Sequence, residues 1–109
     1  MSAVIGNECE RILAWQCVAD KLPPFCQNHR FHPARKFELD IAWPAHKVGC
    51  EINGGVFNQG AHGRPMNILR DMEKSNLLVV SGWRVLRYTP AQVRSGEAIE
   101  GLKQLLGVR

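Results

Sequence analysis

The sequence lacks the marks of a membrane or secreted protein. No stretch approaches the roughly 18 to 20 consecutive apolar residues that span a bilayer. The N-terminus, MSAVIGNECERI, has no basic segment followed by an apolar one, as a secretion signal would have. No CxxC pair occurs among the four cysteines, which favours reduced core thiols over a disulfide scaffold. We therefore expect a cytoplasmic protein that makes no contact with membranes.

Internal repeats and low-complexity tracts are also missing, and 109 residues leave no room for a second core. We expect one domain over residues 1–109. The chain carries 14 Lys and Arg against 10 Asp and Glu, a formal charge of +4. Nine of the basic residues are arginines, whose planar guanidinium matches phosphate oxygens. This composition favours an anionic partner.

Capping residues, prolines and apolar periodicity predict an α/β fold. The expected elements are a helix over Asn7–Asp20, a short strand over Asn28–His32, hairpin strands over Lys36–Trp43 and Val48–Gly54, a helix over Pro65–Val80, a strand over Trp83–Thr89 and a closing helix over Pro90–Leu106. A crossover would lay the last strand parallel to a hairpin strand. The result is a mixed central sheet flanked by helices, with Trp15, Trp43 and Trp83 in core positions.

The predicted hairpin carries the strongest local pattern. If it turns about Ala45 and His46, the numbers of paired residues sum to 91, as 45 and 46 do. Because side chains alternate, one face is then almost wholly apolar. It takes Phe37, Leu39, Ile41 and Trp43 opposite Gly54, Ile52, Cys50 and Val48.

The other face of this hairpin is acidic, with Asp40 opposite Glu51 and Glu38 opposite Asn53. Opposed carboxylates repel, so the folded protein must protonate one of them or supply a cation. Oxygen ligands favour Mg²⁺ or Mn²⁺, which can activate water and neutralise a phosphate. The alternative is an ordinary exposed face whose acids pair with nearby lysines or arginines.

Several blocks of the sequence together resemble small phage and bacterial endonuclease-like proteins related to very-short-patch repair endonucleases, of the PD-(D/E)xK superfamily. These blocks are FHPARKFELDIAWPAHKVGCEINGGVF, GAHGRP, DMEKSN and GWRVLRYTP. The resemblance implies a restriction-endonuclease-like αβββαβα core in a bacterial or phage-infected cell, and hydrolysis of DNA phosphodiesters with Mg²⁺ or Mn²⁺. It also implies that Asp40 and Glu51 bind the metal, with the Ile52 carbonyl as a further ligand.

One position departs from that pattern, because Asn53 stands where the superfamily has its catalytic lysine. Lys74 is the candidate substitute, and it shares a helix face with Asp71 three residues before it. An ordinary surface ion pair is the alternative for these two residues.

Other candidates have both functional and structural interpretations. In the glycine-rich loop, His62 could shuttle a proton and Arg64 could hold a phosphate, or both are simply solvated. Glu10 either completes a capping box with Asn7 or lies near the metal. Gln16 either faces the cleft that would hold this metal or is a satisfied buried amide. Phosphate contacts are predicted for Arg64, Arg70, Arg84 and Arg87.

Two rival functions stay open. A catalytically silent DNA-binding module on a nuclease fold is compatible with Asn53. A small zinc-stabilised interaction domain would rest on the spacing of Cys26, His29 and His32. The sequence also allows a homodimer.

Overall fold

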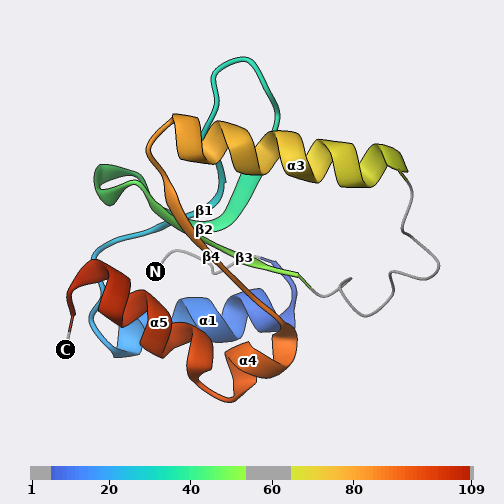
Figure 1. Cartoon of the computed structure of the whole chain (residues 1–109). Coiled ribbons are helices and arrows are strands. Elements are labelled where there is room, and N and C mark those ends of the chain that lie inside the picture. Colours follow the sequence, from blue (N-terminus) through green and yellow to red (C-terminus); the bar gives the residue numbers. More distant parts are fainter. Residues whose placement is uncertain (1–5, 54–64, 109) are drawn as a thin grey trace.

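A four-stranded mixed sheet lies between helices, with α3 on one face and α1, α4 and α5 on the other (Figure 1). The structure is a computed structural model that describes residues 6–53 and 65–108. In chain order the elements are α1 (Glu8–Ala19), β1 (Cys26–Arg30), β2 (Glu38–Trp43), the 3-10 turn η1 (Pro44–His46), β3 (Val48–Ile52), α3 (Pro65–Val80), β4 (Arg84–Tyr88), α4 (Pro90–Arg94) and α5 (Glu97–Leu106). The predicted α/β class with a mixed sheet is confirmed.

The strands follow one another across the sheet in the order β1-β2-β3-β4. The first three are antiparallel neighbours, and β4 runs parallel to β3 after the α3 crossover. Ile41 pairs with Cys50 and Trp43 with Val48, so the predicted hairpin register is confirmed there. Lys47 closes the turn in the left-handed region, with φ at +52°.

Capping residues set the start of α1, as the sequence predicts. The Asn7 side chain accepts from the Glu10 amide at 2.9 Å, and the Asn7 amide donates to Glu10 Oε1 at 2.7 Å. This reciprocal pair satisfies two amides that the first helical turn leaves without partners.

Three predicted boundaries need correction. The first strand begins at Cys26 instead of Asn28, because Cys26 finds a pairing partner in Ala42 of β2. The hairpin strands are shorter than predicted at their outer ends, covering Glu38–Trp43 and Val48–Ile52. The closing helix is two helices, since Gly96 adopts a φ of +88° that no helix continues through.

The prediction of one apolar hairpin face is wrong. Ile41 and Trp43 pack with α1 and α5, whereas Leu39 packs with Leu78 and Trp83 on the α3 side. Phe37 also lies on the α3 side, where the Arg70 guanidinium is 5.8 Å from the centre of its ring. The alternation of side chains therefore reverses phase around Asp40.

A backbone irregularity in the neighbouring strand accompanies this reversal. Asn28 of β1 has a φ of +52°, and the pairs on either side of it are Gln27 with Ile41 and His29 with Leu39. A left-handed residue interrupts the regular pleat that keeps alternate side chains on opposite faces. Asp40 lies across from Asn28, at the point where the pleat is interrupted.

The buried residues divide into two layers, one on each face of the sheet. The larger layer packs the sheet against α1, α4 and α5 and includes Leu13, Cys17, Trp43, Val48, Val93 and Leu102. Trp43 and Trp83 are buried as predicted, but Trp15 is 48% exposed because it projects from the solvent side of α1. All four cysteines are free thiols. Within the described ranges, no helix has the length and apolar character needed to cross a membrane.

Candidate active site at the end of the hairpin

Glu51 lies on the α3 face of β3 and is almost buried. Lys74 of α3 places its Nζ 2.6 Å from Glu51 Oε2, and the side chains of the two residues are only 13% and 14% exposed. The same ammonium donates to the backbone carbonyl of Glu38 at 2.6 Å. The sequence predicted from helix periodicity that Lys74 would approach the acidic residues of the hairpin. The structure agrees, because α3 places the Lys74 ammonium against Glu51.

Among the residues that the structure describes, the second oxygen of Glu51 has no hydrogen-bond partner although it is buried. Arg87 Nη2 lies 3.6 Å from it, too long for a hydrogen bond. A buried carboxylate oxygen without a partner is unfavourable by about 1–3 kcal/mol or more. This atom is therefore a point where a ligand or cation would be stabilised.

Asp40 is held at the place where β2 and β3 separate. Its Oδ2 accepts from the Ile52 amide at 2.8 Å, so the carboxylate bridges to β3 through the backbone. Burial raises the pKa of Asp40 from its ordinary value of 3.8 to about 6, the Ile52 hydrogen bond opposes this rise, and nearby Glu10 and Glu51 add to it. Asp40 is therefore an acid whose charge is poorly compensated.

The third member of this acidic cluster is Glu10, whereas the sequence predicted Glu38. Glu10 lies close enough to Asp40 that its carboxyl group raises the pKa of Asp40. The predicted pairing of Glu38 with Asn53 does not form, because the pairs of β2 with β3 end at Ile41 and Cys50, and the Asn53 amide donates instead to the Tyr88 carbonyl at 2.9 Å. Glu10 caps α1, as predicted, and it also adjoins Asp40; its place near a metal stays a prediction.

Within the described ranges, no three His, Cys, Asp or Glu side chains come close enough together to enclose a metal ion. Mg²⁺ does not require such an enclosure, because it is commonly held by one or two carboxylates and retains several waters. Asp40, Glu51 and the Ile52 carbonyl therefore form a donor set of the right chemistry for Mg²⁺ or Mn²⁺.

The zinc hypothesis receives no support from the positions of Cys26, His29 and His32. The His29 ring lies 5.5 Å from the Trp83 ring. His32 Nδ1 accepts backbone hydrogen bonds from Ala34 at 3.1 Å and Arg35 at 3.2 Å. The imidazoles are thus engaged in packing and turn formation.

Arg87 links β4, β3 and α3. It donates to Ser75 Oγ at 2.9 Å and lies 3.4 Å from Asp71 Oδ2 as well as 3.6 Å from Glu51. Since Asp71 and Ser75 are four residues apart, they share a helix face and both point toward β4. These contacts suit a residue that positions α3 and Glu51 better than one that is free to bind a phosphate.

The other predicted phosphate contacts are dispersed. Arg70 is exposed beside Phe37 on the α3 side of the sheet. Arg84 is exposed on β4, and strand alternation directs it to the face opposite Arg87. His62 and Arg64 lie outside the described residues. The three predicted arginines that the structure describes, Arg70, Arg84 and Arg87, therefore do not form one surface.

Gln16 of α1 contacts α4. Its Nε2 is 3.5 Å from the Val93 carbonyl, and its Oε1 is buried with no hydrogen-bond partner among the described residues. The amide is therefore bonded on one side only, which supports the interpretation as a satisfied buried amide only in part.

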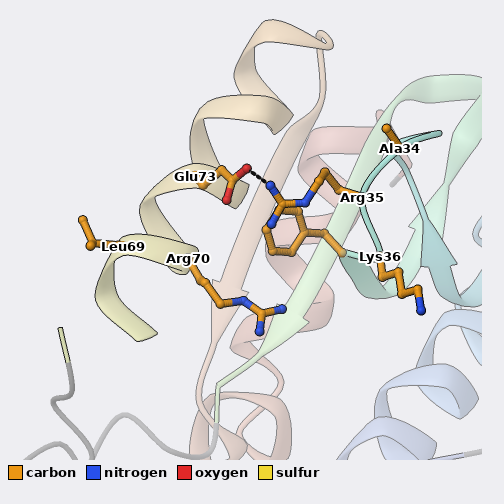
Figure 2. Close-up of a pocket in the computed structure, with 7 residues that line it drawn as sticks. Ala34, Arg35, Lys36, Leu69, Arg70 and Glu73 are labelled. Atoms are coloured by element: carbon orange, nitrogen blue, oxygen red, sulfur yellow. Dashed lines mark hydrogen bonds and ion pairs between the residues drawn. The ribbon is translucent and has the colours of Figure 1, made fainter. Parts of the chain in front are cut away.

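Sequence reasoning missed two groups that flank the site. Ser75 was overlooked, although its spacing from Asp71 places it on the same helix face. The sequence prediction placed Arg35 in the segment before the hairpin and Lys36 in the first hairpin strand, yet both line a hollow between that segment and α3 (Figure 2). Their charge next to an aromatic residue was the available signal.

Comparison with known proteins identifies no relative: no family model, no curated protein and no solved structure matches this chain. The function must therefore be argued from the side chains themselves.

Proposed function

We propose that this protein is a divalent-metal-dependent DNA endonuclease of the PD-(D/E)xK type, built on a restriction-endonuclease-like core. The observation that carries the proposal is the almost buried Glu51, which has one oxygen bound to Lys74 and the other without a hydrogen-bond partner in residues 6–53 and 65–108. A carboxylate, a second acid and a lysine at one strand end form the group that this chemistry needs. Such an enzyme would act on DNA in the cytoplasm of a bacterial or phage-infected cell.

The metal would be held by Asp40, Glu51 and the Ile52 carbonyl. Two features support this donor set: the unpartnered oxygen of Glu51 and the unfavourable charge on Asp40, which a cation would relieve. When bound, Mg²⁺ or Mn²⁺ would neutralise charge on the phosphate and make water easier to deprotonate.

Lys74 would take the part of the lysine that Asn53 replaces. Its ammonium has three N–H donors, of which two bind Glu51 and the Glu38 carbonyl. The third donor can orient the attacking water or bind a phosphate oxygen. Because Lys74 also holds Glu51 Oε2, it keeps the orientation of this carboxylate defined before substrate arrives.

A catalytically silent DNA-binding module is the second candidate. It is favoured by the ion pairs of Glu51 with Lys74 and Arg87, since two cations already offset this charge without a metal. The hypothesis of a zinc-stabilised domain can be tested by metal analysis of the purified protein. One equivalent of zinc would support it.

The deciding experiment is cleavage of supercoiled plasmid over a titration of Mg²⁺ and, separately, Mn²⁺. The wild type should convert the plasmid to nicked or linear forms, whereas Asp40→Ala should not. Glu8→Gln is the matched control, because Glu8 is 70% exposed and lies on α1 outside the acidic cluster. Wild-type protein that binds the plasmid but leaves it intact with either metal would refute the enzyme and favour the silent module.

A further inference from the structure

Arg87 lies between two acids that belong to different elements. Glu51 and Arg87 are partners in the parallel pairing of β3 with β4, so both side chains project from the same face of the sheet toward α3. From α3, Asp71 and Ser75 both contact the Arg87 guanidinium. One cation is therefore within reach of two carboxylates, Glu51 and Asp71.

The guanidinium is hydrogen-bonded to α3 and only close to Glu51. Its Nη2 donates to Ser75 Oγ at 2.9 Å, and its Nη1 donates to Asp71 Oδ2 at 3.4 Å. The distance from Nη2 to Glu51 Oε1 is 3.6 Å, too long for a hydrogen bond. A movement of less than about 1 Å would bring these two atoms to an ordinary N–H···O distance. The contacts with α3 thus hold Arg87 just short of Glu51.

The two carboxylates near Arg87 differ in burial. The side chain of Glu51 is 13% exposed, whereas that of Asp71 is 61% exposed. Solvent screens an exposed carboxylate, so it holds an arginine more weakly than a nearly buried carboxylate does. Glu51 alone would therefore draw Arg87 toward Oε1. The contacts with Asp71 and with the Ser75 hydroxyl oppose that movement.

Oε1 is also the oxygen of Glu51 that a metal would use, because Lys74 already binds Oε2 at 2.6 Å. A guanidinium hydrogen-bonded to Oε1 would take one of its lone pairs and place a positive charge beside the incoming cation. Arg87 and a divalent cation are thus hard to accommodate on this atom together.

We propose that Arg87 and the divalent cation are alternative partners of Glu51 Oε1. Asp71 and Ser75 are then positioning residues, because they hold Arg87 back and keep Oε1 available to the metal. This inference rests on the proposed function, since it takes Glu51 to be a metal ligand.

The test measures the affinity of the DNA-free protein for Mn²⁺, from the loss of the EPR signal of the free ion. The proteins compared are the wild type, Asp71→Asn, Ser75→Ala, Arg87→Gln and the double variant Asp71→Asn with Arg87→Gln. Two matched controls remove the same charges elsewhere. Glu73→Gln changes an acid of α3 that is bound to Arg35, and Arg94→Gln changes an exposed arginine of α4.

Arg87→Gln should raise the Mn²⁺ affinity by about fivefold, because it removes a positive charge beside Oε1. Asp71→Asn should lower the affinity by about threefold, because it releases Arg87 toward Glu51. Ser75→Ala should lower it by about twofold although it removes no charge. The double variant should bind like Arg87→Gln, since Asp71 acts only through Arg87. Each control should change the affinity by less than about 1.5-fold.

The double variant decides whether Asp71 acts through Arg87. If Asp71→Asn lowers the affinity equally with and without Arg87, its charge acts through space and the inference is overturned. An Arg87→Gln protein with unchanged or lower affinity also overturns it, as does an unchanged affinity in Ser75→Ala. Thermal melts in chelator establish that each variant folds. If Arg87→Gln does not fold, Arg87→Met replaces it, because methionine keeps an unbranched apolar stem.

The same titration separates this inference from the proposed nuclease. Mn²⁺ affinities that follow the expected pattern without any cleavage of plasmid would support the inference and exclude the enzyme. Plasmid cleavage by the wild type, with equal Mn²⁺ affinity in all variants, excludes only the inference. A wild type that binds no Mn²⁺ at millimolar concentrations excludes both.

Discussion

Replacing Asp40 by asparagine should stabilise the protein at neutral pH while abolishing cleavage. Burial and the neighbouring Glu10 and Glu51 raise the pKa of Asp40 to about 6 in the folded state, from 3.8. Between these values the folded protein binds a proton that the unfolded chain does not. The free energy of unfolding therefore falls as pH rises through this window and stays lower above it.

The size of the stabilisation follows from the difference between the pKa of Asp40 in the folded protein and in the unfolded chain. Two pH units would correspond to about 2.7 kcal/mol for a fully buried group. Because Asp40 is only partly buried, solvent screening reduces the expected effect to about 1–2 kcal/mol. Asparagine keeps an oxygen that can accept from the Ile52 amide. For a chain of this size 1 kcal/mol shifts the melting temperature by about 4–8 °C, so the gain is then about 4–16 °C.

The assay compares thermal melts of wild type and Asp40→Asn in chelator at pH 7.5 and pH 4. The variant should melt higher at pH 7.5, and the difference should vanish at pH 4, where Asp40 is neutral in the wild type. Glu8→Gln, at an exposed acid, should change stability by less than about 0.5 kcal/mol at either pH. Millimolar Mg²⁺ should then raise the melting temperature of the wild type alone.

Two results would refute this reasoning. Equal melting temperatures of wild type and Asp40→Asn at pH 7.5 would mean that the Asp40 charge is not destabilising. Equal stabilisation of both proteins by Mg²⁺ would mean that Asp40 is not a metal ligand.

Two other substitutions test the lysine and the packing. Lys74→Ala should lower the single-turnover cleavage rate by roughly 10²-fold or more, as loss of a positioning or acid–base group does, and a second change, Asn53→Lys, should restore part of it. Cleavage at the wild-type rate would show that Lys74 has no such role. Gly49→Ala should destabilise the fold by about 1–3 kcal/mol in urea titrations, because the new Cβ would lie 2.6 Å from Leu39 Cδ1. An unchanged midpoint would show that Leu39 can shift freely.

The sequence alone was sufficient for features that depend on residues close together in the chain. The capping box of α1 and the register of the hairpin both arise from side chains a few residues apart. The position of Lys74 over the hairpin followed from helix periodicity, once a crossover to β4 was assumed. The break at Gly96 was also a local signal, and it was overlooked.

Tertiary structure alone decided the composition of the acidic cluster. Asp40 departs from simple alternation because Asn28, on another strand, interrupts the pleat beside it. Glu10 reaches Asp40 only because α1 packs under the sheet. Arg87 contacts α3, and Arg70 reaches Phe37, only because α3 packs on that face of the sheet. Periodicity defines which face of an element a residue occupies, but the distance between two elements depends on how the whole core packs.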